Sequence, residues 1–330
     1  MGQPDLNQPL LKVSDLKTYF HTPEGTVRAV DGVDLELATG EVLGLVGESG
    51  CGKSVTALSI LRLIPEPPGE IVSGRVLLQG TDLLSLKRSE MRDVRGNRIS
   101  MIFQEPMTSL NPVFRIGEQI AETIRLHQNS PVNLSREKAV DMLKAVGIPS
   151  AHLRYKDYPH QLSGGMRQRV MIAMAFSCNP EILIADEPTT ALDVTIQAQI
   201  LDLMNGMKES TNSSVIFITH NLGIIAENAK RVMVMYMGRV VESADVKTIF
   251  NEPKHPYTVG LLESIPRKGK RRGRDALTSI PGIVPSLLDL PSGCAFRDRC
   301  SDFVSGTCEQ KAPPVVETEP GHLVRCWRFR

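Results

Sequence analysis

The residue types with the clearest chemical meaning lie between positions 47 and 54. They are Gly47, Glu48, Ser49, Gly50, Cys51, Gly52, Lys53 and Ser54. Glycines let a backbone wrap closely around phosphate groups, and successive N–H groups at a helix start attract anions. At this spacing Lys53 reaches the β and γ phosphates and the Ser54 hydroxyl ligates Mg²⁺. The pattern predicts an ATP-binding loop, here called the P-loop, between a buried strand at Val42–Val46 and a helix at Ser54–Leu63.

Two acids end a second apolar run. The run Ile182–Ala185 is followed directly by Asp186 and Glu187, and a similar run occupies Val215–Thr219. Buried parallel strands carry polar groups at their functional edge in this way. We expect Asp186 to hold Mg²⁺ through water, and Glu187 to polarise or deprotonate the attacking water. The sequence therefore predicts hydrolysis of ATP as well as binding.

A second seat for phosphate is predicted at Leu162–Met166. Ser163, Gly164 and Gly165 precede an apolar helix, and small or polar residues at a helix start favour an anion. This seat lies about 110 residues beyond the P-loop. A simple P-loop hydrolase needs only one such seat.

The order of these motifs resembles that of the ATP-binding cassette (ABC) family over about residues 11–250. The resemblance implies an α/β P-loop NTPase fold with an antiparallel β layer and a helical subdomain at about 105–178. It also implies a head-to-tail dimer with a second, homologous ATPase. In such a dimer Ser163, Gly164 and Gly165 serve the partner's nucleotide, and closure on ATP supplies the mechanical stroke.

The same resemblance gives roles to further residues. Phe20, with Tyr19 as the next choice, is expected to stack on adenine. Gln104 matches a glutamine that joins Mg²⁺ and the attacking water, and His220 matches a histidine that contacts the γ-phosphate. Asp193, in Ala191-Leu192-Asp193, matches a loop that crosses the dimer interface.

A change in composition after Phe250 predicts a boundary between a cassette at 1–250 and an extension at 251–330. The stretch from His255 to Thr258 resembles the C-terminal extension of oligopeptide, dipeptide and nickel importer ATPases. Ile280-Pro281-Gly282 and Gly293-Cys294 fit it too. The basic run at 267–274 is interpreted as a solvated linker.

Four of the six cysteines, Cys294, Cys300, Cys308 and Cys326, crowd into the end of the chain. Their C-x₅-C-x₇-C-x₁₇-C spacing contains no CxxC pair, which disfavours a zinc ribbon. Four thiolates could hold Zn²⁺ or an iron–sulfur cluster, or could be free structural thiols. The resemblance to dipeptide-importer ATPases favours a [4Fe–4S] cluster.

Composition bounds the class of protein. The chain of 330 residues contains 41% hydrophobic residues, which is enough for an ordinary packed core. Its net charge is only +1, so it has no strong positive electrostatic potential that would attract nucleic acid. No apolar run approaches the ~18 residues that span a bilayer, and the N-terminus has no signal-peptide pattern. We expect a peripheral protein at the cytoplasmic face of the inner membrane.

The resulting hypothesis is an ATPase subunit that energises uptake of dipeptides or oligopeptides. Its expected partners are two transmembrane permease subunits, the second ATPase and, indirectly, an extracytoplasmic peptide-binding protein. One alternative is import of nickel or another small solute by the same architecture. Another is a non-transport ABC ATPase, in DNA repair or on the ribosome, and a third is a regulatory, non-enzymatic subunit. The intact Lys53, Glu187 and His220 argue against the last.

Overall fold

The computed structural model describes residues 8–104, 109–190, 193–265, 280–288 and 290–330. The chain divides into two compact units, and each is described by itself. Unit one comprises residues 1–37, 42–84 and 217–330, and unit two comprises 38–41 and 85–216. These units divide the chain at positions other than residue 250. The boundary predicted near residue 250 therefore stays a prediction. The basic run at 267–274 lies outside the described residues.

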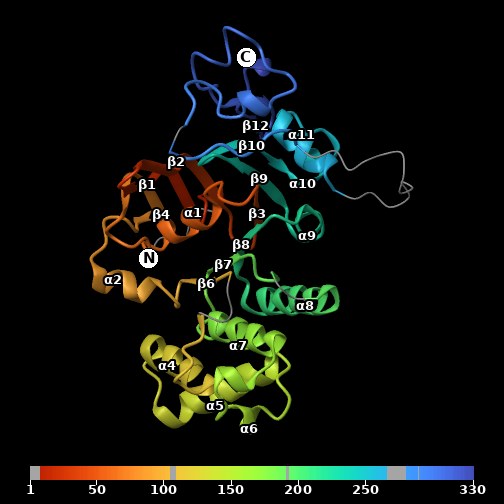
Figure 1. Cartoon of the computed structure of the whole chain (residues 1–330). Coiled ribbons are helices and arrows are strands. Elements are labelled where there is room, and N and C mark those ends of the chain that lie inside the picture. The colour runs from red at the N-terminus through yellow and green to blue at the C-terminus, as the bar shows by residue number, and fades with distance from the viewer. Residues whose placement is uncertain (1–7, 105–108, 191–192, 266–279, 289) are drawn as a thin grey trace. The chain divides into compact units, whose positions relative to one another are not determined.

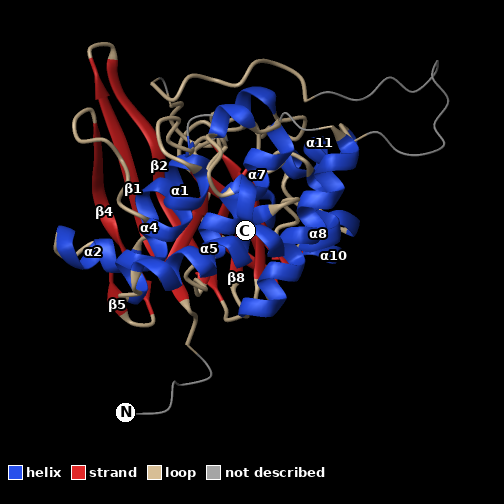
Figure 2. Cartoon of the chain, turned by 90° about the horizontal axis from the view of Figure 1, so that it is seen from below, coloured by secondary structure: helices blue, strands red, loops and turns tan. Residues whose placement is uncertain are grey.

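Unit one contains an antiparallel sheet in the order β2-β1-β4-β5, whose long strands lie side by side in Figure 2. In its register Leu11 of β1 lies between Leu37 of β2 and Leu78 of β4, and all three side chains are buried. The expected antiparallel layer is thus present. The strands are β1 (Leu11–Thr22), β2 (Gly25–Leu37), β4 (Gly69–Leu78) and β5 (Thr81–Asp82).

A second run of strands in unit one follows the order β11-β12-β10-β9-β3. Only β3 and β9 are parallel, and the other neighbours are antiparallel (Figure 1). Every residue of β3 is buried, as expected for an apolar strand covered on both faces. The strands are β3 (Val42–Val46), β9 (Arg231–Tyr236), β10 (Arg239–Asp245), β11 (Val316–Glu319) and β12 (His322–Val324).

The helix after the P-loop, α1 (Lys53–Ile60), is shorter than predicted. Arg62 adopts a left-handed φ of 51°, and the Leu63 N–H donates to the Leu58 carbonyl. Such a left-handed residue closes a helix, so α1 ends before the prolines at 65–68 are reached. The other helices of unit one are α9 (Leu222–Asn228), α10 (Val246–Asn251), α11 (Pro256–Glu263), and the 3₁₀ turns η2 (Arg297–Arg299) and η3 (Trp327–Phe329).

Unit two pairs β6 (Ile99–Ile102) with β7 (Ile182–Asp186) in parallel and is otherwise mainly helical. Helix α4 buries Ile116, Ile120 and Ile124, which recur at the helical spacing of four. The predicted helical segment is confirmed over its described residues. The helices are α2 (Arg88–Val94), α4 (Ile116–Gln128), α5 (Val132–Ala145), α6 (Ala151–Arg154), α7 (Gly164–Phe176), α8 (Val194–Thr211) and the 3₁₀ turn η1 (Pro159–Gln161).

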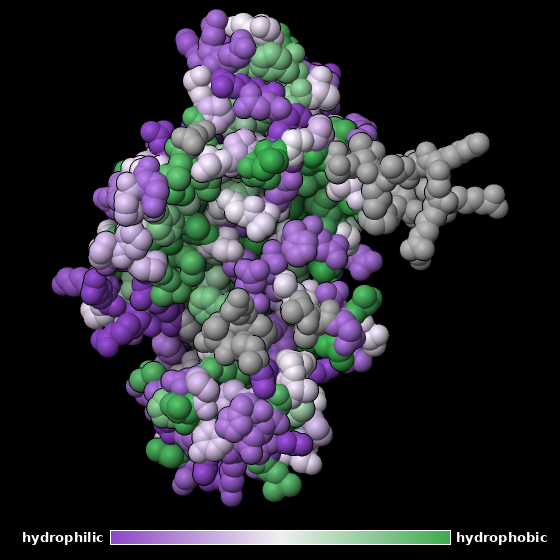
Figure 3. Space-filling view, in the orientation of Figure 1, coloured by the Kyte–Doolittle hydropathy of each residue, from purple (hydrophilic) through white to green (hydrophobic). Residues whose placement is uncertain are grey.

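Strand β8 (Ser214–Thr219) passes from unit two into unit one after Ile216. Within the described ranges, no helix combines the length and apolar character needed to cross a bilayer. Figure 3 shows that the visible face of the helical segment is largely hydrophilic with isolated apolar side chains. The exposed apolar residues of unit two include Val113, Phe114, Leu126, Val132 and Leu153.

Candidate nucleotide-binding site

Backbone contacts require glycine at two P-loop positions. A Cβ atom on Gly47 would lie 2.2 Å from the Met235 carbonyl oxygen, and one on Gly52 would lie 2.2 Å from the Ala29 carbonyl oxygen. Gly52 also has a left-handed φ of 104° and caps α1. Any larger residue would displace the loop from β9 or β2. Glycine is therefore required at these positions by close packing as well as by backbone conformation.

Lys53 lies buried inside the loop. Its side-chain ammonium donates hydrogen bonds to the carbonyl oxygens of Gly47, at 2.8 Å, and Glu48, at 3.0 Å. Ser54 follows at the first turn of α1 and is partly exposed. The roles predicted for Lys53 toward phosphate and for Ser54 toward Mg²⁺ stay predictions. Ser49 and Gly50 form the exposed tip of the loop.

Cys51 turns its side chain into the protein. The residue is 1% exposed, and burial raises the pKa of its thiol above the usual value. Its backbone carbonyl accepts a hydrogen bond from the Gly238 N–H at 3.0 Å, which ties the loop to the β9–β10 turn. The thiol is therefore shielded from solvent rather than displayed at the loop tip.

The C-terminal region bonds directly to the P-loop, a relationship that the sequence reasoning missed. Arg299 donates to both carboxylate oxygens of Glu48, from Nη1 at 2.7 Å and from Nη2 at 3.0 Å. The backbone N–H of Glu48 donates to the Tyr257 hydroxyl oxygen at 2.9 Å. Arg299 and Tyr257 lie 251 and 209 positions from Glu48, so no local pattern indicates either bond.

The segment His255–Thr258 forms the start of helix α11. His255 caps α11 by accepting the Tyr257 N–H at Nδ1, and Pro256 occupies the first turn. Burial lowers the pKa of His255 to about 3, so the ring is neutral and can accept this bond. This start directs Tyr257 into the interior, where its hydroxyl meets the P-loop.

His220 follows β8 and shares a cavity of about 390 Å³ with the first P-loop residues. The neighbouring Asn221 caps α9 by accepting the Gly223 N–H at 3.0 Å. The predicted γ-phosphate histidine therefore stands at the same cavity as the P-loop. The cavity is lined by Val46, Gly47, Glu48, His220, Leu222, Leu261, Ser264, Ile280, Gly282, Val284 and Arg299.

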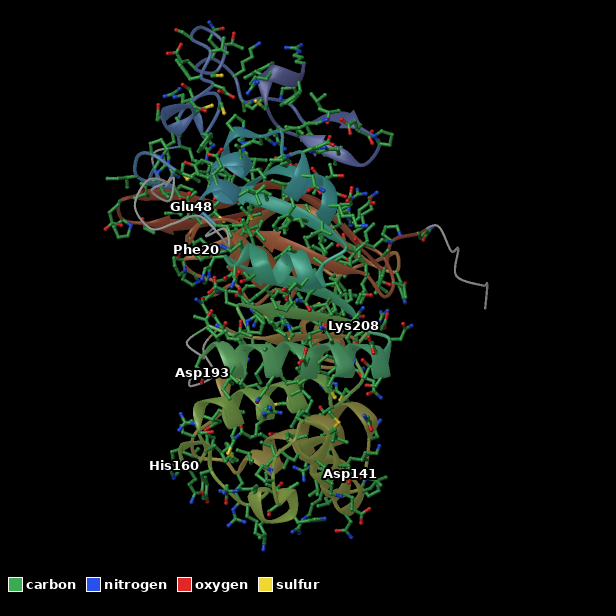
Figure 4. The ribbon with its side chains drawn as sticks, turned by 90° about the vertical axis from the view of Figure 1, so that its right-hand side faces the viewer. Phe20, Glu48, Asp141, His160, Asp193 and Lys208 are labelled. Carbon is green, nitrogen blue, oxygen red and sulfur yellow. The ribbon has the colours of Figure 1, made fainter. Side chains whose placement is uncertain are left out.

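The two candidate adenine-stacking residues have different surroundings. The Tyr19 hydroxyl donates to Asp31 at 2.8 Å, and the Arg28 guanidinium lies 5.7 Å from the ring centre. Phe20 is half-buried and forms no polar bond, and its ring edge lies against Gly69. Figure 4 shows Phe20 and Glu48 at the same edge of unit one. Phe20 thus keeps the apolar ring that stacking needs.

The predicted catalytic acids lie in unit two. Glu187 accepts a hydrogen bond from Gln104 Nε2 at 3.3 Å and one from the Thr190 hydroxyl at 2.8 Å. Asp186 is the last residue of β7 and is buried. Glu187 has a left-handed φ of 45°, which is uncommon for a residue with a side chain and occurs frequently at functional turns. Gln104 and Glu187, predicted separately, are therefore brought together.

The second phosphate seat is the exposed start of α7. Ser163 caps this helix by accepting the Met166 N–H at 3.4 Å, and a Cβ on Gly164 would meet nothing within 4 Å. A Cβ on Gly165 would meet Ile196 at 3.3 Å. Asp193 caps α8 by accepting the Ile196 N–H at 2.9 Å, whereas Ala191 and Leu192 lie outside the described residues. The roles predicted for these residues toward a partner stay predictions.

The four C-terminal cysteines line one small cavity together with His255, Phe296 and Trp327. Burial raises the pKa of the Cys294 thiol to about 11, and the three other thiols nearby add to this effect. Among the residues described, however, no group of three or more His, Cys, Asp or Glu side chains could hold a metal ion. The thiols are gathered, but they are not arranged around a single ion.

Comparisons with known proteins match both parts of the chain. Residues 30–190 match the family described as ABC transporter. Residues 241–308 match the family described as oligopeptide/dipeptide transporter, C-terminal region. A probable peptide ABC transporter ATP-binding protein of Sinorhizobium fredii is 54% identical over 97% of this chain and 95% of its own length.

Two relatives from Bacillus subtilis match over a similar extent. The oligopeptide transport ATP-binding protein AppD is 51% identical over 97% of both chains. The dipeptide transport ATP-binding protein DppD is 48% identical over 97% of this chain and 95% of its own. A solved dimeric ATP-binding cassette, bound to ADP and phosphate after hydrolysis, matches with a TM-score of 0.64 and 26% identity. That match covers 72% of this chain and 98% of the other. The chain therefore belongs to the ABC transporter family of ATPases, in the group that carries the oligopeptide/dipeptide transporter C-terminal region.

Proposed function

We propose that this chain is the ATP-hydrolysing subunit of a membrane importer for dipeptides or oligopeptides. The observation that carries the proposal is the identity to peptide, oligopeptide and dipeptide transport ATP-binding proteins, which spans nearly the whole chain. It includes the C-terminal region as well as the cassette. A general ATP-binding cassette would be expected to match over the cassette alone.

Uptake by cells tests this proposal. Cells that lack the gene should lose uptake of labelled di- or oligopeptides, and the wild-type chain should restore it. The Glu187→Gln variant, expressed at the same level, should not. Nickel and other small solutes are the alternative cargo, and the same cells are assayed for ⁶³Ni²⁺ uptake. Unchanged peptide uptake with lost nickel uptake would overturn the peptide assignment.

The ATP chemistry is proposed from the chemical types of the motif residues and the roles that the family resemblance implies. Lys53 would bind the β and γ phosphates and Ser54 would ligate Mg²⁺, with the loop N–H groups as the cradle. Glu187 would accept a proton from the attacking water. Asp186 would hold Mg²⁺ through water, and Gln104 would join Mg²⁺ and the attacking water. The bonds of Glu187 to Gln104 and Thr190 support the role of Glu187, since they orient the carboxylate. His220 would contact the γ-phosphate.

A second ATPase subunit is proposed to complete the site. Ser163 and Gly164 are exposed at the start of a helix of 13 residues, where N–H groups favour an anion. The dimeric state of a cassette among the structural relatives supports a dimer.

The remaining partners are proposed to be two transmembrane permease subunits, with the chain bound peripherally at the cytoplasmic face. An extracytoplasmic peptide-binding protein would act indirectly, and nucleic acid is not an expected partner. Purification from native membranes followed by mass spectrometry tests this assembly. Recovery with permease subunits and a second ATPase is the expected result. Recovery with DNA-repair or ribosomal proteins instead would favour a non-transport ABC ATPase.

We propose further that Cys294, Cys300, Cys308 and Cys326 hold a [4Fe–4S] cluster. Their convergence on one cavity supports this, as does the affinity of thiolates for iron. Such a group would organise a loop-rich segment.

Anaerobic purification with metal analysis tests the cluster. The expected result is a brown protein with iron, acid-labile sulfide and broad absorbance near ~400 nm. Bound zinc without iron would indicate the zinc alternative, and colourless, metal-free protein would indicate structural thiols. Either result would overturn the cluster without affecting the ATPase assignment.

A further inference from the structure

The pair of Arg299 and Glu48 places a fixed ion pair at the edge of the phosphate cradle. Glu48 is the second residue of the P-loop, and its carbonyl oxygen accepts a bond from the Lys53 ammonium at 3.0 Å. Both partners of the pair line the cavity that also contains His220. A carboxylate at this position would repel the polyanionic phosphates of ATP unless a positive charge compensated it.

Arg299 is held in place from several sides. Its side chain is 4% exposed, and Nε donates to the Pro281 carbonyl oxygen at 3.1 Å. The guanidinium lies 5.9 Å from the ring centres of Tyr236 and Phe296. A Cβ on Gly282 would lie 3.2 Å from the Arg299 side chain, so this segment packs closely against it. The guanidinium is therefore preorganised to bind Glu48 and cannot swing away at low cost.

The Glu48 backbone is held as well as its side chain. Its N–H donates to the hydroxyl of Tyr257, a residue that is fully buried against Tyr236 and Phe296. Both anchors come from the C-terminal region, which is separate in sequence from the cassette motifs. A loop that is held in one conformation loses less entropy when it binds a ligand.

We propose that Arg299 is a positioning residue of the ATP site, which neutralises and orients Glu48 so that the P-loop can accept the nucleotide's phosphates. Tyr257 supports it by holding the Glu48 backbone. The C-terminal region is thus a working part of the nucleotide site in this chain. The proposal rests on ATP binding at the P-loop. The Lys53→Ala variant, which should not bind ATP, is the negative control for the affinity measurement.

The test measures the dissociation constant for Mg-ATP with the purified full chain. Arg299→Met leaves the Glu48 carboxylate uncompensated beside the phosphates, and we expect affinity to fall about tenfold or more. Glu48→Gln with Arg299→Met removes both charges, and affinity should return to within about threefold of wild type. A purely structural role of Arg299 predicts no such recovery, because the double variant also lacks the arginine.

Arg297→Met is the matched control. Arg297 occupies the same 3₁₀ turn but bonds to Ser292 and Asp298, not to the P-loop. Its loss should leave ATP affinity within about twofold of wild type, because it compensates no charge at the cradle. Thermal melting of each variant shows whether the fold survives the substitution.

If Arg299→Met does not fold, Arg299→Lys gives the decisive result. Lysine keeps the positive charge but cannot form the bidentate hydrogen bond to Glu48, so affinity for Mg-ATP should fall less than about fivefold. Unchanged affinity in a folded Arg299→Met would overturn the proposal. A double variant as weak as Arg299→Met, or a loss of tenfold or more in Arg299→Lys, would do the same. Absence of ATP binding in the wild-type chain would instead remove the P-loop assignment itself.

Discussion

Gln104 donates a hydrogen bond from Nε2 to Oε2 of Glu187 over 3.3 Å, and the Thr190 hydroxyl donates to the same oxygen over 2.8 Å. Two donors therefore orient one carboxylate directly after the strand β7. A general base must be held within reach of the water that it deprotonates, and such orientation is the contribution that neighbouring residues supply. Gln104 is in this sense a partner of Glu187 as well as a candidate Mg²⁺ ligand.

Glu187→Gln should abolish hydrolysis while ATP binding persists. An amide has nearly the shape of the carboxylate but cannot accept a proton, and general bases contribute about 10²–10⁴-fold to rate. The P-loop is unchanged, so the dissociation constant for Mg-ATP should stay within about threefold of wild type. Phosphate release and nucleotide binding are measured on the same preparation. Glu209→Gln, at an exposed position of α8, is the control and should hydrolyse ATP normally. Normal turnover in the Glu187 variant would remove its catalytic role.

Gly164→Glu should separate ATP binding from turnover. A Cβ at Gly164 meets nothing within 4 Å, so the fold should tolerate the change, and the melting temperature should stay close to that of wild type. The new carboxylate would repel a partner's phosphates at the start of α7, which should prevent ATP-dependent dimerisation and turnover. Binding of ATP by the isolated chain should persist. Dimerisation is read by light scattering in the Glu187→Gln background.

Gly206→Glu provides the matched control for this substitution. Gly206 also lies in a helix, and a Cβ there likewise meets nothing within 4 Å. The same glycine-to-glutamate change is thus made in open space, but away from the second phosphate seat. It should leave ATP-dependent dimerisation unchanged. Equal loss in both variants would assign the Gly164 effect to helix destabilisation instead.

Motifs that act through their own local backbone could be predicted from the sequence. The P-loop is defined by glycines that its turn requires and by the strand and helix on either side of it, all contiguous in the chain. The runs at Ile182–Ala185 and Val215–Thr219 likewise became β7 and β8 because continuous apolar residues form buried strands. As expected, polar residues stand at the C-terminal ends of both strands, with Asp186 ending β7 and His220 following β8.

Contacts between distant segments could not be predicted. The bond from Arg299 to Glu48 depends on the 3₁₀ turn η2, on Pro281 and on two aromatic rings, and no periodicity encodes that meeting. The length of α1 was overestimated because the left-handed Arg62 depends on the local turn rather than on residue type. In the first case tertiary packing decides what local propensity leaves open, and in the second a local turn does.

Cys51 should resist thiol reagents in the folded chain. Its thiol is 1% exposed and its pKa is raised by burial, and only the exposed thiolate reacts quickly. Labelling with N-ethylmaleimide at neutral pH, followed by mass spectrometry, should show Cys51 modified only after unfolding. Modification should therefore not be a means by which ATP binding is blocked in the native protein.

Ser49→Cys is the control for that measurement. Ser49 lies at the exposed tip of the same loop, so a cysteine there should react rapidly and Mg-ATP should protect it. Comparable labelling rates for Cys51 and Ser49→Cys in native protein would show that the loop opens. In that case the static burial of Cys51 would not describe its accessibility.

Phe20→Ala should weaken binding of ATP but not of inorganic tripolyphosphate. Loss of an aromatic ring that stacks on a base costs ~1–3 kcal/mol, so ATP affinity should fall about tenfold. Tripolyphosphate has no base to stack, and its affinity reports the P-loop alone. Tyr19→Phe is the matched variant, since it removes only the hydroxyl that donates to Asp31, and it should bind both ligands as wild type does. If Phe20→Ala weakens both ligands equally, its ring has a structural role against Gly69 rather than a contact with adenine. If ATP affinity instead stays unchanged in Phe20→Ala and falls in Tyr19→Ala, the stacking role passes to Tyr19.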